Sequence, residues 1–190
     1  MIFTRIHVCG GGLRALLVAD VARRVAQVAG RQARVSWAFD APRASDLNIY
    51  PPDEMTTDHP ADGLLVNCPD APDSLRVAEH AGAVPDDPLA LRLALLDSPV
   101  GTPPVSGDAG ETLRRWRSAV AGWARSPGAP SSRAHVKAAV AAFGELDMRG
   151  AVEVLRVVEA DNHIAPGAKF ETFAYLDRIL GVDLARDLGR

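Results

Sequence analysis

The residues of this chain best suited to chemistry surround a run of glycines near its start. They are Cys9, Gly10, Gly11, Gly12 and Arg14. A glycine turn that opens a helix leaves backbone N–H groups unpaired and free of blocking side chains, an arrangement that binds phosphate or carboxylate. Cys9 would border such a site, and the guanidinium of Arg14 would help to neutralise the ligand's charge. A tight turn with a purely structural role is the alternative interpretation.

The patterns on either side of the glycines predict the elements that hold them. Residues 2–8 alternate with a period of two and place β-branched side chains on one face, which predicts a strand. From Leu13 to Val28 the apolar residues recur at helical spacing, with a polar face opposite them: Asp20, Arg23, Arg24 and Gln27. Residues 34–39 alternate again. Strand, glycine turn, helix and strand together make a βαβ unit of the nucleotide-binding type.

Asp40 joins the candidate ligand-binding residues because it follows the second predicted strand. Open α/β sheets bind their ligands at the carboxyl ends of the strands. A structural role for Asp40 stays open as well.

Composition narrows the class of protein. With 190 residues, 47% of them hydrophobic, the chain can bury a substantial core. It has no apolar run of the ~18 residues that a membrane span needs, and its start lacks a basic-then-apolar export signal. We therefore expect a cytoplasmic protein without a membrane partner. Cys9 and Cys68 are too few for a disulfide framework, so we expect them to be thiols in a reducing compartment.

The charge distribution argues against nucleic-acid partners. Residues 1–97 carry 9 Arg against 13 acidic residues, and residues 98–190 carry 12 Lys and Arg against 11 acidic residues. Neutralisation of phosphates supplies most nucleic-acid affinity, and neither half has the excess of basic residues that this requires. tRNA binding through the second half is therefore disfavoured.

Prolines and glycines divide the chain. Residues 98–107 (Ser-Pro-Val-Gly-Thr-Pro-Pro-Val-Ser-Gly) predict a linker between a domain at 1–97 and a helical domain at 108–190. In the first domain, residues 63–68 predict a buried strand, and Asp87 before Pro88 predicts a capped helix. The second domain has amphipathic stripes throughout, and Asp108 with Glu111 forms a capping-box pattern. The predicted fold is α/β: a small Rossmann-like parallel sheet followed by an all-α bundle.

Several segments in the same order resemble cysteinyl-tRNA synthetase or the related ligase that joins cysteine to glucosaminyl-inositol in mycothiol synthesis. Residues 7–10 (His-Val-Cys-Gly) resemble the end of that family's first strand, and residues 16–24 resemble the following helix. Residues 47–53 (Leu-Asn-Ile-Tyr-Pro-Pro-Asp) with residues 57–59 (Thr-Asp-His) are similar to a family segment Leu-Asn-Val-Leu-Pro-Pro-Asp…Ala-Thr-Glu-His. Residues 89–96 and 114–148 resemble the family's helices after the catalytic domain.

The departures from the family are as informative as the likeness. The His-Ile-Gly-His signature and the Lys-Met-Ser-Lys-Ser loop, which stabilise the family's transition state, have no counterpart, and the chain has only two lysines, Lys137 and Lys169. The resemblance therefore implies a non-catalytic relative. It would bind an ATP-like or AMP-like small molecule or a protein partner as an accessory module. The alternative is a residual amino-acid adenylating or cysteine-ligating enzyme with a remodelled site.

The resemblance also raises the question of zinc, which the family binds through two Cys, a His and a Glu. Cys9 resembles the first Cys ligand. Residues 63–68, which end in Cys68, are weakly similar to the family strand that carries the second Cys ligand, and His80 is a candidate for a third ligand. Zinc takes three or four ligands about a tetrahedron, and these residues have no standard spacing. Buried thiols at strand ends are the favoured interpretation, and no metal is assigned.

Overall fold

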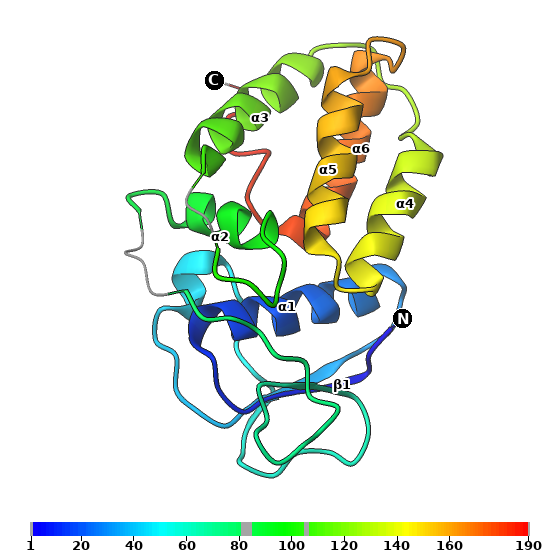
Figure 1. Cartoon of the computed structure of the whole chain (residues 1–190). Helices are drawn as coiled ribbons and strands as arrows, with labels where there is room; N and C mark the ends of the chain where they lie inside the picture. Colours follow the sequence, from blue (N-terminus) through cyan, green and yellow to red (C-terminus); the bar gives the residue numbers. More distant parts are fainter. Residues whose placement is uncertain (1, 81–84, 105–106, 190) are drawn as a thin grey trace.

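The protein, described here from a computed structural model, is an α/β fold with a helical C-terminal part (Figure 1). The structure describes residues 2–80, 85–104 and 107–189. Parts of the predicted domains and linker lie outside the described residues. These are residues 1 and 81–84 of the first domain, residues 105 and 106 of the linker, and residue 190 of the helical domain. None of the helices in the described part combines the length and apolar character needed to cross a bilayer.

The sheet has four parallel strands in the order β3-β2-β1-β4. The strands are β1 (Arg5–Val8), β2 (Arg34–Trp37), β3 (Glu54–Met55) and β4 (Leu64–Val66). Three of them match predicted strands. β3 and the 3-10 turn η1 (Ala44–Leu47) lie in the proline-rich stretch, where the sequence predicts only a loop. Ile6 and Val8 of β1 are buried in the hydrophobic core as expected, but His7 on the opposite face is buried as well.

Six α-helices complete the described part of the fold. They are α1 (Gly12–Val28), α2 (Pro88–Leu96), α3 (Ala109–Trp123), α4 (Arg133–Gly144), α5 (Met148–Ala160) and α6 (Pro166–Leu180). Asp87 caps α2 as predicted, because its carboxylate accepts the N–H of Leu89 at 3.1 Å. The predicted capping box of α3 is wrong: Asp108 is at the N-cap, but its side chain makes no cap hydrogen bond.

α1 is the middle of three layers, with the sheet on one side and the helices of the C-terminal part on the other (Figure 1). Both faces of α1 are therefore covered over most of its length, and three of the four residues of its polar face are buried: Asp20 is 3%, Arg24 4% and Arg23 7% exposed, whereas Gln27 is exposed. One cluster of buried hydrophobic residues runs through the sheet part and the helical part. The division into two domains, residues 1–97 and residues 108–190, stays a prediction.

Candidate functional site

The glycine turn opens onto a cleft at the carboxyl ends of β1 and β2. Its volume is about 530 Å³, and it is lined by residues 9–13 after β1 and residues 39–43 after β2. Parallel strands end at the same edge of a sheet, which explains why two segments some 30 positions apart meet here. The structure thus brings together five of the predicted site residues: Cys9, Gly10, Gly11, Gly12 and Asp40.

The three glycines do different things in this turn. Gly11 and Gly12 have φ of 97° and 65°, in the left-handed region that favours glycine. A Cβ on Gly11 would lie 1.9 Å from Nδ2 of Asn67, whose side-chain amide is held by the backbone N–H and C=O of Val77. Gly11 is therefore required by the fold. Gly10 has no such restriction, because a Cβ there would have no atom within 4 Å.

The N-terminus of α1 is left without a side-chain cap. Its N-cap residue is Gly11, which has no side chain to accept a hydrogen bond, and the first turn carries no acidic residue. The free N–H groups and the partial positive charge of the helix end favour an anion at this position.

Arg14 does not serve the cleft, which corrects the expectation from the sequence. Its side chain is buried, and its two terminal guanidinium nitrogens donate to the backbone carbonyls of Ala78, Ser98, Pro99 and Thr102. Burial lowers the pKa of this guanidinium from its usual value. Arg14 therefore ties the start of α1 to the segment after α2.

Arg43 provides the positive charge at the cleft instead. It lines the cleft and forms an exposed ion pair with Asp46 at 3.2 Å. The sequence could have identified Arg43 as a candidate site residue, because it lies three residues after Asp40 in the loop that follows the second predicted strand. Asp40 is exposed, and among the described residues it forms no ion pair.

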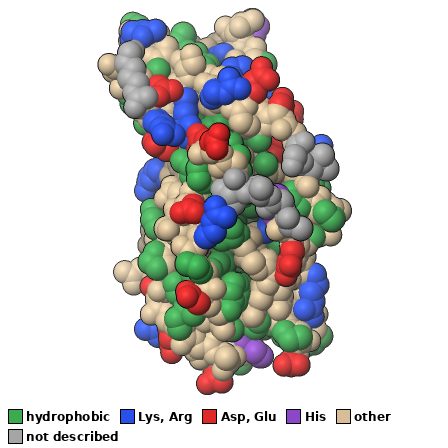
Figure 2. Space-filling model, turned by 90° about the vertical axis from the view of Figure 1, so that its left-hand side faces the viewer, with side chains coloured by type: hydrophobic (Ala, Val, Ile, Leu, Met, Phe, Trp, Pro, Cys, Tyr) green, Lys and Arg blue, Asp and Glu red, His purple; other side chains and the backbone are tan. Residues whose placement is uncertain are grey.

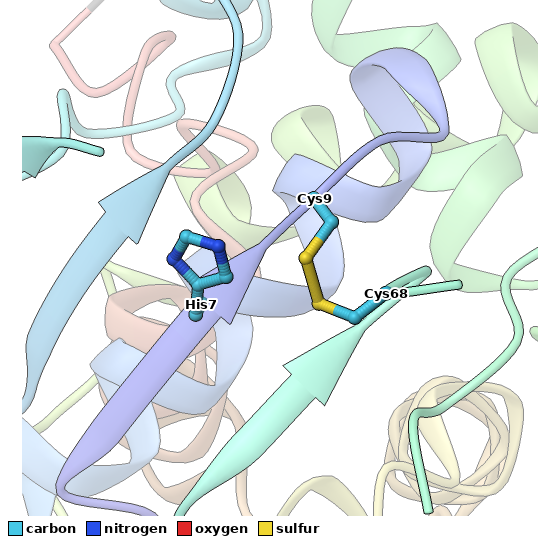
Figure 3. Close-up of side chains that lie close together, drawn as sticks. All are labelled: His7, Cys9 and Cys68. Carbon is cyan, nitrogen blue, oxygen red and sulfur yellow. A yellow bond between two sulfur atoms is a disulfide. The ribbon is translucent and has the colours of Figure 1, made fainter. Parts of the chain in front are cut away.

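The two cysteines form a disulfide, so the expectation of free thiols is wrong. Cys9 follows β1 and Cys68 follows β4, and the register that pairs Val8 with Val66 brings their Cα atoms to 4.9 Å. This separation lies within the range that a disulfide spans. Figure 3 shows the bridge between the ends of the two strands.

His7 lies beside the disulfide (Figure 3). It is fully buried, and its Nδ1 forms a 2.8 Å hydrogen bond with Oγ of Ser36, while its Nε2 is buried and has no hydrogen-bond partner among the described residues. Burial and the neighbouring His59 lower the pKa of His7, and Asp58 opposes this. The neutral imidazole is therefore favoured.

The ligand-type atoms of His7, Cys9 and Cys68 lie within 4.8 Å of one another. His80, the third zinc candidate from the sequence, is not part of this group. Metal ions bind thiolates, and neither sulfur of a disulfide is one. Zinc thus stays a hypothesis for the reduced protein alone, with His7 in the place proposed for His80.

Both lysines lie far from the cleft in the sequence and belong to the helical part. Lys137 is on the exposed surface of α4. Lys169 is 6% exposed, and its ammonium group donates to the carbonyl of Glu159 at 2.7 Å. Neither residue lines the cleft.

The charged surface on the side where β1 ends and α1 begins is mixed. Figure 2 looks onto the left-hand side of Figure 1 and shows acidic and basic side chains interspersed, with hydrophobic side chains gathered in the lower half. A face of this kind lacks the continuous positive charge that polyanion binding uses.

Comparisons with protein-family models, with curated proteins and with solved structures found no match to this chain. The resemblance to the cysteinyl-tRNA synthetases therefore stays a hypothesis drawn from the sequence.

Proposed function

We propose that this protein binds a small nucleotide-like anion in the cleft beside Gly10, Gly11 and Gly12, and that it does so without activating an amino acid. The observation that carries the proposal is the uncapped N-terminus of α1 opening onto a cleft at the carboxyl edge of a parallel sheet. Helix N-termini at this edge are where α/β folds hold phosphate groups.

The cleft offers complementary surfaces for the other parts of a nucleotide. Leu13, Phe39 and Pro42 form an apolar wall that suits a flat base. Asp40, after β2, has a carboxylate that can accept hydrogen bonds from ribose hydroxyl groups. Arg43 adds positive charge near the phosphate. An ATP-like or AMP-like ligand fits this order of groups.

The absence of catalysis rests on the residues that the sequence lacks. The synthetase signature histidines and the lysine loop are missing, and neither Lys137 nor Lys169 lines the cleft. Removing one preplaced donor typically lowers the rate by ~10²–10³. We expect cysteine-dependent exchange of pyrophosphate into ATP to equal a control without protein. Saturable exchange would instead support the alternative, a residual adenylating or cysteine-ligating enzyme.

A thermal-shift experiment tests ligand binding directly. The oxidised protein is screened against ATP, AMP, cysteine and a non-hydrolysable cysteinyl-adenylate analogue. A ligand at 100 times its Kd adds about 2.7 kcal/mol to the unfolding free energy. For a chain of this size this corresponds to a rise in Tm of about 5–10 °C. No rise with any of the four would contradict the proposal and favour an accessory role on a protein partner.

Two variants locate the binding. Gly10→Val places methyl groups over the turn, where a Cβ meets no atom within 4 Å, so the fold should survive while the anion is excluded. Gly128→Val is the matched control, since its Cβ is equally unobstructed but lies after α3. We expect the ligand-induced rise in Tm to disappear in the first variant and persist in the second. Equal rises in both would place the site elsewhere.

A further inference from the structure

The disulfide occupies the position in the sheet where its strand order reverses. From β1 the chain builds outward to β2 and β3, and it then returns to add β4 on the other side of β1. Cys9 follows β1 and Cys68 follows β4, so the S–S bond spans the crevice between these two strand ends. Open α/β sheets bind their ligands at this crevice, so a small thiol would meet the disulfide there.

The two sulfurs differ in access. Cys9 is partly exposed and lines the cleft. Cys68 is 1% exposed, its N–H donates to Oγ of Ser74 at 2.8 Å, and its sulfur lies 3.6 Å from the carbonyl oxygen of Val66. Thiol exchange requires a path to the sulfur under attack. A thiol from solvent can therefore reach Cys9, whereas Cys68 is shielded.

His7 lacks a hydrogen-bond partner that the reduced protein would supply. Its Nδ1 is hydrogen-bonded to Ser36, and its Nε2 is buried with no hydrogen-bond partner in the part of the chain that the structure describes. Figure 3 shows this far side of the ring turned toward the disulfide. When Nδ1 donates its hydrogen to Oγ of Ser36, Nε2 is an acceptor, and a disulfide has no proton to give it, whereas each thiol of the reduced pair has one. Since a buried polar atom without a partner is costly, reduction would relieve a cost that the oxidised state carries.

We propose that Cys9 and Cys68 form a redox-active pair that exchanges with low-molecular-weight thiols through Cys9. A thiolate attacks Sγ of Cys9, the bond between the cysteines breaks, and Cys68 leaves with the electron pair and takes up a proton. In the mixed disulfide, Cys9 is bonded to the sulfur of the first low-molecular-weight thiol. A second thiolate attacks that sulfur and releases Cys9 as a thiolate, which is then protonated. In total, two thiols are oxidised to one disulfide, and their two protons and two electrons reduce the cysteine pair. In the tautomer that leaves Nε2 of His7 an acceptor, a cysteine S–H then donates to it.

The first test uses the full-length oxidised protein and millimolar reduced glutathione, with mass spectrometry after acid quenching. We expect reduction of the pair and a transient glutathione adduct under native conditions. If the disulfide resists glutathione and dithiothreitol in the folded protein but is reduced in denaturant, it is structural and the proposal is wrong. This result is independent of whether the cleft binds a nucleotide.

Single-cysteine variants identify the reacting sulfur. With oxidised glutathione, Cys68→Ser should form one adduct on Cys9, whereas Cys9→Ser should react roughly tenfold or more slowly, because access limits exchange. Far-ultraviolet circular dichroism of both variants checks the fold. Equal adduct rates in two folded variants would overturn the role of Cys9.

The role of His7 is tested by the position of the redox equilibrium in a glutathione buffer. His7→Asn keeps a polar group that can form a hydrogen bond with Oγ of Ser36, but it has no atom equivalent to Nε2. Loss of one hydrogen bond to the reduced state should shift the equilibrium roughly fivefold toward the disulfide. His59→Asn, an exposed neighbour whose ring lies 6.3 Å from His7, should leave it unchanged. An unshifted equilibrium in His7→Asn would exclude His7 from the exchange.

Discussion

Replacing Asp20 by Asn should destabilise the protein strongly, because it removes the charge that balances two buried guanidiniums. Oδ2 of Asp20 accepts hydrogen bonds from Arg24 at 2.8 Å and from Arg92 at 2.7 Å, and the three side chains are 1%, 4% and 0% exposed. The remaining donors of Arg92 are held by carbonyls at the ends of η1 and α6, including those of Leu47 and Leu180. Neither guanidinium can move into water without opening the core.

The size of the effect follows from this burial. Removing one partner of a buried ion pair typically costs about 3–5 kcal/mol, since the other charge is left uncompensated. For a chain of 150–250 residues, each kcal/mol lowers Tm by about 2–4 °C, so we expect a fall of about 6–20 °C. Asn keeps the shape of Asp and an oxygen that can accept the N–H of Tyr50, now 3.2 Å from Oδ1 of Asp20. Its NH2 group then takes the place of the oxygen that accepts from Arg24 and Arg92, so the loss reports on the charge and on these two hydrogen bonds together.

Differential scanning calorimetry and urea unfolding would measure the change. Asp62→Asn is the matched control, because its 2.6 Å ion pair with Arg5 is exposed on both sides, at 55% and 67%. Exposed pairs contribute about 0–1 kcal/mol, so this variant should lose at most a few degrees. We infer that Asp20, Arg24 and Arg92 together hold α1, α2 and α6 in contact. If Asp20→Asn and Asp62→Asn unfold at similar temperatures, this inference is refuted.

Three further predictions concern the turn, the buried histidine and the helical part. Gly11→Ala should lower Tm by several degrees more than Gly10→Ala in the same calorimetric measurement, because only the first forces a Cβ onto Asn67 at positive φ; equal stability would contradict the turn geometry. Burial lowers the pKa of His7, so below pH 6.5 the unfolded chain binds a proton that the folded chain resists, and the unfolding free energy should fall with falling pH. Urea titrations at several pH values should show a shallower fall for His7→Asn, and an unchanged slope would exclude this contribution. A fragment of residues 108–190 should be largely helical by circular dichroism, yet unfold less cooperatively than the whole chain, because α1 no longer covers α4 and α6; strand signal in it would refute the predicted division.

The local patterns of the sequence were sufficient to predict most of the elements. A period of two located β1 and β2, a helical period located α1, and the pair Asp87-Pro88 located the start of α2. The candidate cleft could also be predicted, since Cys9 and Asp40 each follow a strand and parallel strands end at one edge. These features depend on residues close together in the chain.

The features that the sequence did not predict depend on long-range packing. Asp20 and Arg24 on the polar face of α1 are buried under α2 and α6, and Asp20 finds its second partner 72 positions away in Arg92. The fate of Arg14 is similar, since its carbonyl partners come from a segment that the sequence marks as a linker. The disulfide depends on the register between β1 and β4, and no local pattern near either cysteine encodes it.

The position of α1 connects the candidate site with the helical part. Its N-terminal turn faces the cleft, Arg14 in its first turn holds the segment after α2, and Arg24 toward its C-terminal end donates to a carbonyl near the end of α6. Without the C-terminal helices, the charged face of α1 would lose the carbonyls and the apolar cover that make its burial tolerable. The helical part therefore supports the helix that presents the glycine turn.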